Sequence, residues 1–130
     1  MNKREIIAYF DARAPEWDAR MVRDELVIRK ILDNAEIWDG LDILVRPGVS
    51  VLDVACGTGV LFGDYLARDA ARVTGVDISP EMARIAVSKL RDPRVEVLCG
   101  DVEELPLPRR YDCCVVYNAF PHFAHPARLL

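Results

Sequence analysis

Four short apolar segments separated by helical patterns constrain this chain of 130 residues more than any other feature. The segments are residues 51–55, 72–77, 94–99 and 111–117. Strands that alternate with helices in this way predict βαβ units with right-handed crossovers, and therefore a parallel sheet. Because most positions within each segment are apolar, we expect helices to cover both faces of the sheet. The fold class is therefore predicted to be α/β, with a Rossmann-like sheet.

The first third of the chain has a different pattern. In residues 1–46, apolar side chains recur near helical spacing, with an interruption at Pro15. Pro47 and Gly48 then end the helical pattern. We therefore expect residues 1–46 to form an N-terminal helical extension and residues 47–130 to form the core that contains the sheet.

Composition argues against several classes of protein. Apolar residues make up 52% of the chain and the net charge is −4, whereas disordered chains combine low hydrophobicity with high net charge. A dedicated nucleic-acid binder usually needs a basic face, which this mild acidity does not suggest. No apolar run approaches the roughly 18 residues of a membrane span, and the N-terminus has no apolar signal core. We expect a cytoplasmic protein whose four cysteines are reduced and mostly buried, namely Cys56, Cys99, Cys113 and Cys114.

Glycines follow the first apolar segment, where a parallel sheet binds its ligands. Gly57 and Gly59 allow a sharp turn and a close approach of a ligand to the backbone. A dinucleotide fingerprint would need a third glycine or alanine at position 62, where Phe62 stands instead. Asp53 precedes the turn and would repel a pyrophosphate, but it could hold an ammonium group directly or through water. The turn therefore favours an amino acid joined to a nucleoside over a diphosphate.

Acidic residues also end the second and third segments. Asp77 is placed to accept hydrogen bonds from both ribose hydroxyls, although it could instead cap the next helix, a role that Ser79 already fills. Asp101 is placed to accept a hydrogen bond from the exocyclic amine of adenine, or it could be a turn residue. Ile78 and Val102 would enclose the ring, unless they are ordinary core residues.

Four sequence motifs resemble those of the class I S-adenosylmethionine-dependent methyltransferases. They are V-L-D-V-A-C-G-T-G, V-T-G-V-D-I-S, G-D-V-E-E-L-P and Y-D-C-C-V-V-Y-N-A-F, and they occur in the order and spacing of that family. The segment F-D-A-R-A-P-E-W-D also resembles a lid of the small-molecule branch that includes the quinone-biosynthesis enzymes.

The resemblance implies a cofactor, S-adenosylmethionine, and a set of residues that surround it. Asp53, Cys56, Gly57 and Gly59 would contact its methionine part, and Asp77, Asp101 and Val102 its nucleoside. Asn118 and Ala119 would lie beside the sulfonium. The aromatic residues Tyr9, Phe10 and Trp17 would cover the cofactor, or they are core contacts of an amphipathic helix.

The implied reaction is direct in-line transfer of the methyl group to a small-molecule acceptor. Alignment of the two reactants would supply most of the rate gain. His122 is the candidate general base for an acceptor that must lose a proton, although Pro121-His122-Phe123 could simply begin the next helix. No metal site is expected, because His122 and His125 have no third ligand nearby.

The resemblance also implies a strand order of 3-2-1-4, followed by three further strands that the chain does not contain. The fourth strand would then be an exposed apolar edge. Either the chain is a truncated protein, or another chain, such as a second copy, covers that edge. Two alternative functions stay open: a fragment that binds the cofactor without catalysis, and a nucleotide-dependent oxidoreductase on the same scaffold.

Overall fold

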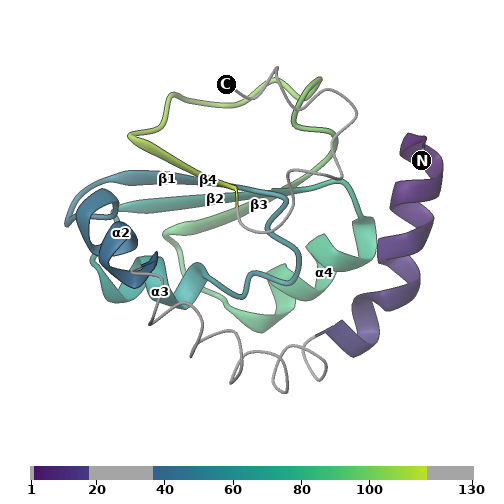
Figure 1. Cartoon of the computed structure of the whole chain (residues 1–130), viewed down its shortest axis with the longest axis horizontal. Coiled ribbons are helices and arrows are strands. Elements are labelled where there is room, and N and C mark those ends of the chain that lie inside the picture. Colours follow the sequence, from purple (N-terminus) through teal and green to yellow (C-terminus); the bar gives the residue numbers. More distant parts are fainter. Residues whose placement is uncertain (1, 18–36, 117–130) are drawn as a thin grey trace.

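The computed structural model describes residues 2–17 and 37–116, and for residues 37–40 it describes the backbone only (Figure 1). The described helices are an N-terminal helix at residues 3–17, α2 (Ile37–Leu44), α3 (Phe62–Ala67) and α4 (Pro80–Lys89). The strands are β1 (Ser50–Val54), β2 (Arg72–Asp77), β3 (Val95–Cys99) and β4 (Cys113–Val116). Three strands lie inside the predicted apolar segments, and β1 overlaps its segment but begins one residue earlier, at Ser50.

The four strands form one parallel sheet in the order β3-β2-β1-β4. In the register of this sheet, Val54 is beside both Val76 and Val116, and Val76 is also beside Leu98. The carboxyl ends of all four strands therefore meet at one edge. The predicted fold class and the predicted strand order are both confirmed.

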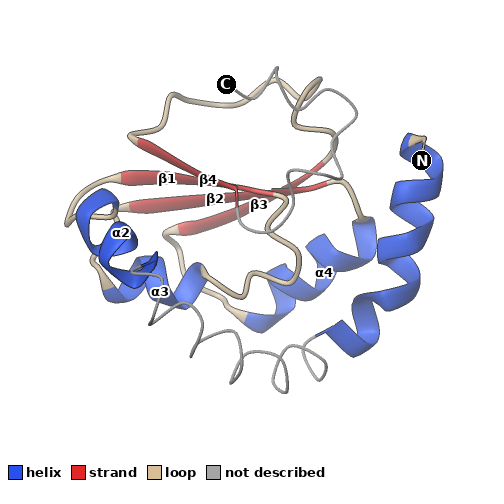
Figure 2. Cartoon of the chain, in the orientation of Figure 1, coloured by secondary structure: helices blue, strands red, loops and turns tan. Residues whose placement is uncertain are grey.

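Helices on both faces of the sheet were expected, but the described helices α2, α3 and α4 lie on one face only (Figure 2). The reason is the direction of the crossovers. The chain moves from β1 to β2 to β3 in one direction, so two right-handed crossovers place α3 and α4 on the same side. The return from β3 to β4 crosses the other face, where residues 100–112 form turns and irregular structure that includes Pro106 and Pro108.

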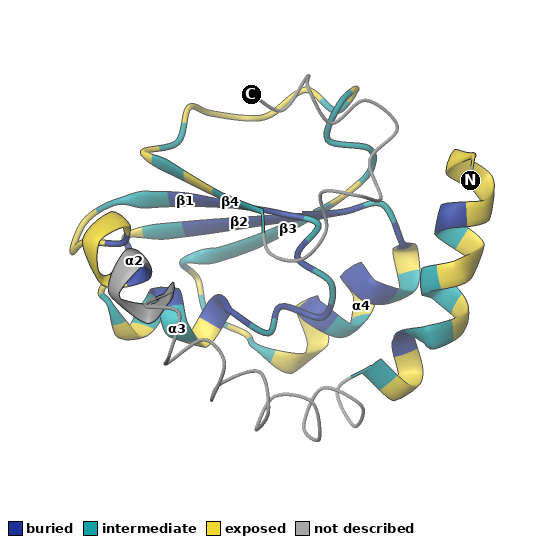
Figure 3. Ribbon diagram, in the orientation of Figure 1, coloured by how far each residue is buried: buried dark blue, intermediate teal, exposed yellow. Residues whose placement is uncertain are grey.

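Alternate residues of the central strands supply two separate apolar cores, and the buried positions are dark blue in Figure 3. Under the helices, Val51 and Val73 pack with Phe62 and Tyr65 of α3. Leu41 and Val45 also belong to this core, although they precede the predicted boundary at residue 46. On the opposite face, a smaller cluster is formed by Leu52, Val54 and Val76, with Val102, Leu105 and Tyr111 packed against it. The return segment therefore covers this face in place of a helix.

The cysteines are free, as expected, but they are not mostly buried. Only Cys56 is buried; Cys113 is half-buried, and Cys99 and Cys114 are exposed. The difference follows from the sheet, because Cys99 and Cys114 lie on its two edge strands, β3 and β4, whereas Cys56 follows a central strand. Within the described residues no helix has the length and apolar character needed to span a membrane.

Candidate cofactor site

The turn after β1 is held in an unusual backbone conformation and is bonded to β2. Ala55, Gly57 and Gly59 have positive φ angles of 57°, 59° and 77°. The Cys56 amide donates to the carbonyl of Val76 at 3.0 Å, and the Gly57 amide donates to Oδ2 of Asp77 at 2.7 Å. Two glycines are therefore required for conformation, as the sequence predicts, and the turn is fixed against the carboxyl end of the neighbouring strand.

Phe62 explains why the third glycine of a dinucleotide fingerprint is missing. Its side chain is fully buried. A Cβ added at Gly59 would lie 2.5 Å from its ring, and a Cβ added at Gly75 would also lie 2.5 Å from it. Phe62 therefore fills the space between the turn and β2. The Cys56 thiol, which would lie 2.8 Å from a Cβ at Gly75, is part of the same packing, so its side chain faces the sheet.

Asp53 lies beneath the turn, near the carboxyl end of β1. It is 3% exposed and pairs in register with Gly75. Burial raises the pKa of Asp53 to about 7; the neighbouring Tyr65 hydroxyl acts in the opposite direction, and the charge of Asp77 adds a smaller increase. The carboxyl group is therefore poised to change its protonation state near neutral pH.

Asp77 organises the next turn with both of its carboxylate oxygens. Oδ2 accepts from the Gly57 amide, and Oδ1 accepts from the Ser79 amide at 2.9 Å. Burial raises the pKa of Asp77, and these two backbone hydrogen bonds partly offset that increase. Ser79 is the N-cap of α4, since its Oγ accepts from the Met82 amide at 3.1 Å. The predicted assignment of the cap to Ser79 is confirmed.

Asp101 begins the turn after β3. Its Oδ1 accepts from the Glu103 amide at 2.9 Å, and its Oδ2 lies 3.1 Å from Nζ of Lys3. Its side chain is only 13% exposed. Ile78 and Val102 are half-buried beside these turns. The first three predicted ligand-binding turns therefore lie at one edge of the sheet.

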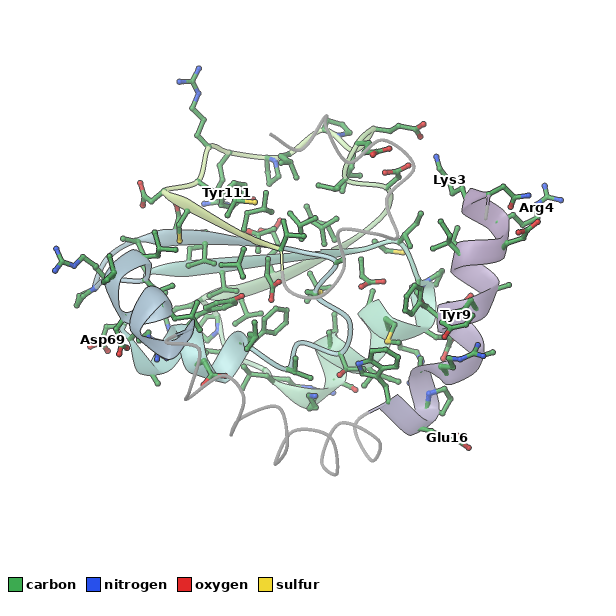
Figure 4. All side chains as sticks on the ribbon, viewed as in Figure 1. Lys3, Arg4, Tyr9, Glu16, Asp69 and Tyr111 are labelled. Carbon is green, nitrogen blue, oxygen red and sulfur yellow. The ribbon has the colours of Figure 1, made fainter. Side chains whose placement is uncertain are left out.

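The N-terminal helix touches all three turns, through more residues than the aromatic ones that the resemblance implied. Lys3 contacts Asp101, Asp11 accepts a hydrogen bond from the Ser79 hydroxyl, and Trp17 Nε1 would lie 3.8 Å from a Cβ at Gly57. Figure 4 shows Lys3 at the start of this helix, with Tyr9 and Glu16 farther along it. The family resemblance implied Trp17 as a residue over the cofactor, but no local pattern pairs Lys3 or Asp11 with residues so distant along the chain.

Aromatic contacts continue along this helix. The ring of Phe10 lies 5.1 Å from that of Tyr9 and 6.0 Å from that of Trp17, both edge-on. The Arg13 guanidinium lies 3.5 Å from the centre of the Tyr9 ring. Phe10 therefore packs edge-on against Trp17, whose Nε1 approaches the glycine turn.

Three of the predicted site residues lie outside the described residues: Asn118, Ala119 and His122. Their roles stay predictions. Among residues 2–17 and 37–116, no group of three or more histidine, cysteine or acidic side chains is arranged to hold a metal ion.

Comparison with known proteins adds to this geometry. A family model described as "Methyltransferase domain" matches residues 51–130. A malonyl-[acyl-carrier protein] O-methyltransferase from Acetivibrio thermocellus is 31% identical over 124 residues, which cover 95% of this chain and 42% of that protein. An 18S rRNA (guanine-N(7))-methyltransferase from Bos taurus is 39% identical over 125 residues, covering 85% of this chain and 43% of that protein.

The structure of a DhpI–SAH complex is similar with a TM-score of 0.67 and 27% identity, over 91% of this chain and 55% of that one. The chain thus spans less than half the length of these two curated relatives.

Proposed function

Because the chain belongs to the methyltransferase domain family, we propose that it binds S-adenosylmethionine and transfers the methyl group to a small-molecule acceptor in the cytoplasm. The observation that carries the proposal is the convergence of three turns on one edge of the sheet. A glycine turn, a buried acid at the end of β2 and a second acid after β3 together match the three chemical parts of that cofactor. Four free thiols accord with a reducing compartment.

The residues at this edge suit each part of the cofactor. Gly57 presents backbone without a Cβ at the turn where the methionine part would approach, and Trp17 Nε1 would lie 3.8 Å from a Cβ there. Asp77 keeps further lone pairs after accepting two amides, since a carboxylate offers about four, and these can accept from ribose hydroxyls. Asp101 can accept from the adenine amine, with Ile78 and Val102 beside the ring.

The chemistry comes from the cofactor, whose sulfonium carries an activated methyl group. The residues of the chain would bind the cofactor and orient it toward the acceptor. Asp53 supplies negative charge beneath the turn for the ammonium group, directly or through water. Trp17 covers the turn and excludes water from it. We assign Asn118 and Ala119 to the neighbourhood of the sulfonium, and His122 to proton removal from the acceptor.

We assign the methyl acceptor to the class of small molecules. The names of the relatives supply two other classes of acceptor, protein and RNA, that experiments must test. The two curated relatives are named for an acyl-carrier protein and for 18S rRNA. A small molecule is favoured over RNA because the chain has a net charge of −4, whereas a nucleic-acid binder usually needs a basic face.

Calorimetry with S-adenosylhomocysteine and with NAD tests the cofactor assignment. We expect S-adenosylhomocysteine to bind and NAD not to bind. A dinucleotide fingerprint has a small residue where Phe62 stands, and here the Phe62 ring fills the space between the turn and β2. Binding of NAD alone would support the oxidoreductase alternative and refute the proposal.

Asp77→Ala should abolish most of the affinity for S-adenosylhomocysteine. Asp69→Asn is the matched control, because Asp69 is an exposed acid at a positive φ of 60°, which asparagine tolerates. Unchanged affinity in a folded Asp77→Ala protein would remove Asp77 from the ribose role.

Turnover with a tritiated methyl donor then separates an enzyme from a fragment that only binds. The acceptor panel should contain small phenols and acids, a malonyl-acyl-carrier protein and ribosomal RNA. Transfer to a small molecule is the expected result. Binding of the cofactor without transfer to any acceptor would leave only the binding function.

A further inference from the structure

Lys3, at the first turn of the N-terminal helix, belongs by its contacts to the adenine end of the proposed site. Its Nζ lies 3.1 Å from Oδ2 of Asp101 and 2.8 Å from Oε2 of Glu104. Lys3 is 101 residues from Glu104 along the chain and almost as far from Asp101, so the contacts depend on the docking of the whole helix. Asp11 and Trp17 fix the rest of that helix against the turns after β2 and β1.

The Asp101 carboxylate is held from two sides. The Glu103 amide donates to Oδ1 and the Lys3 ammonium binds Oδ2, so rotation of the carboxylate would break one contact or the other. The backbone carbonyl of Asp101 also accepts from the amides of Glu104 and Leu105. One lone pair on each carboxylate oxygen is left to accept a further donor.

We propose that Lys3 is a positioning residue that fixes the Asp101 carboxylate as an acceptor and thereby selects adenine over hypoxanthine. The inference rests on the proposed function and deepens it. Adenine presents an exocyclic amine, which donates, where hypoxanthine presents a carbonyl oxygen, which only accepts. A carboxylate fixed in one orientation accepts a hydrogen bond from the amine and repels the carbonyl oxygen, whereas a carboxylate free to rotate toward solvent discriminates less.

The solvent exposure of Lys3 and its two partners predicts how much affinity Lys3→Ala should lose. The Lys3 side chain is 44% exposed and the Glu104 side chain 69%, while that of Asp101 is 13% exposed. The hydrogen bond to Glu104 and then that to Asp101 raise the pKa of Lys3 above its ordinary value of 10.5. Because ion pairs of this exposure are weak, Lys3→Ala should lower the affinity for S-adenosylhomocysteine roughly two- to fivefold.

The test is calorimetry of the 130-residue chain with S-adenosylhomocysteine and with S-inosylhomocysteine, its hypoxanthine analogue. Lys3→Ala should reduce the preference for the adenine compound, Lys3→Arg should restore it, and Glu104→Gln should leave most of it. Arg4→Ala is the matched control, because it removes a neighbouring exposed positive charge from the same helix and should leave the preference unchanged.

Two results would overturn the inference. Unchanged preference in Lys3→Ala would mean that Asp101 is positioned without the ammonium group. Tighter binding in Lys3→Ala would mean that Lys3 competes with adenine for Asp101. Failure of the wild-type chain to bind S-adenosylhomocysteine at all would instead refute the proposed function, so the two failures are distinguishable.

Discussion

The buried carboxyl group of Asp53 makes the stability of this fold depend on pH in a direction that can be measured. Burial raises its pKa from the ordinary value of 3.8 to about 7. The folded state therefore binds a proton between these two values that the unfolded state has released. Stability must fall as pH rises through this window, and the dependence must level off above pH 7.

The magnitude follows from the two pKa values. Each pKa unit corresponds to about 1.4 kcal/mol. Between pH 5 and pH 8.5 the wild-type protein should lose about 3 kcal/mol of unfolding free energy through Asp53 alone. Asp53→Asn keeps the shape of the side chain and cannot ionise, so the free energy of unfolding of this variant should rise relative to wild type by that amount over the same range.

Urea unfolding followed by circular dichroism at several pH values measures the effect. Asp77, whose pKa is also raised, contributes to the pH dependence of both proteins. Its contribution therefore largely cancels when the unfolding free energy of wild type is subtracted from that of Asp53→Asn. Asp69→Asn is again the control, and its difference from wild type should stay flat. A difference between Asp53→Asn and wild type that varied by less than about 0.5 kcal/mol from pH 5 to pH 8.5 would refute the reasoning.

Three further predictions come from the same region and from the sheet edges. Phe62→Ala should cost about 3–5 kcal/mol in urea unfolding, because it empties the space between Gly59 and Gly75, and a loss below about 1 kcal/mol would contradict that packing. Dithionitrobenzoate should label exposed Cys99 and Cys114 in the folded protein but buried Cys56 only after unfolding, so rapid labelling of Cys56 would contradict its position. If Asp53 must be ionised to hold the ammonium group, affinity for S-adenosylhomocysteine should rise about tenfold from pH 6 to pH 8, and not in Asp53→Asn.

The strands were predictable from sequence because apolar runs define them locally. Their order was implied by the resemblance to the methyltransferase family, since crossover handedness decides on which face each connection lies and leaves the order open. The Ser79 cap was predictable for the same reason, since a serine followed by Pro80 and Glu81 marks the start of a helix.

What the sequence did not predict depends on position in the completed sheet. The exposure of Cys99 and Cys114 follows from their place on edge strands, and an edge strand has the same apolar pattern as a central one. Within residues 2–17 and 37–116, the sheet face opposite α3 and α4 carries no helix, because the chain returns across it between β3 and β4 as turns and irregular structure. The Lys3–Asp101 contact needs the docked helix, so no spacing along the chain could indicate it.

Asp77 shows how the proposed site is prepared before any ligand binds. An acid placed only for ribose would be a buried charge with nothing to stabilise it in the empty protein, which is costly. Here the Gly57 and Ser79 amides donate to its two oxygens, so the same carboxylate fixes the glycine turn and the start of α4. A ligand that bonds to Asp77 would therefore meet both turns already in place and would not bear the entropy cost of ordering them. This dual role predicts that substitutions of Asp77 lower stability and affinity together, whereas substitutions of Lys3 act on affinity with little effect on stability.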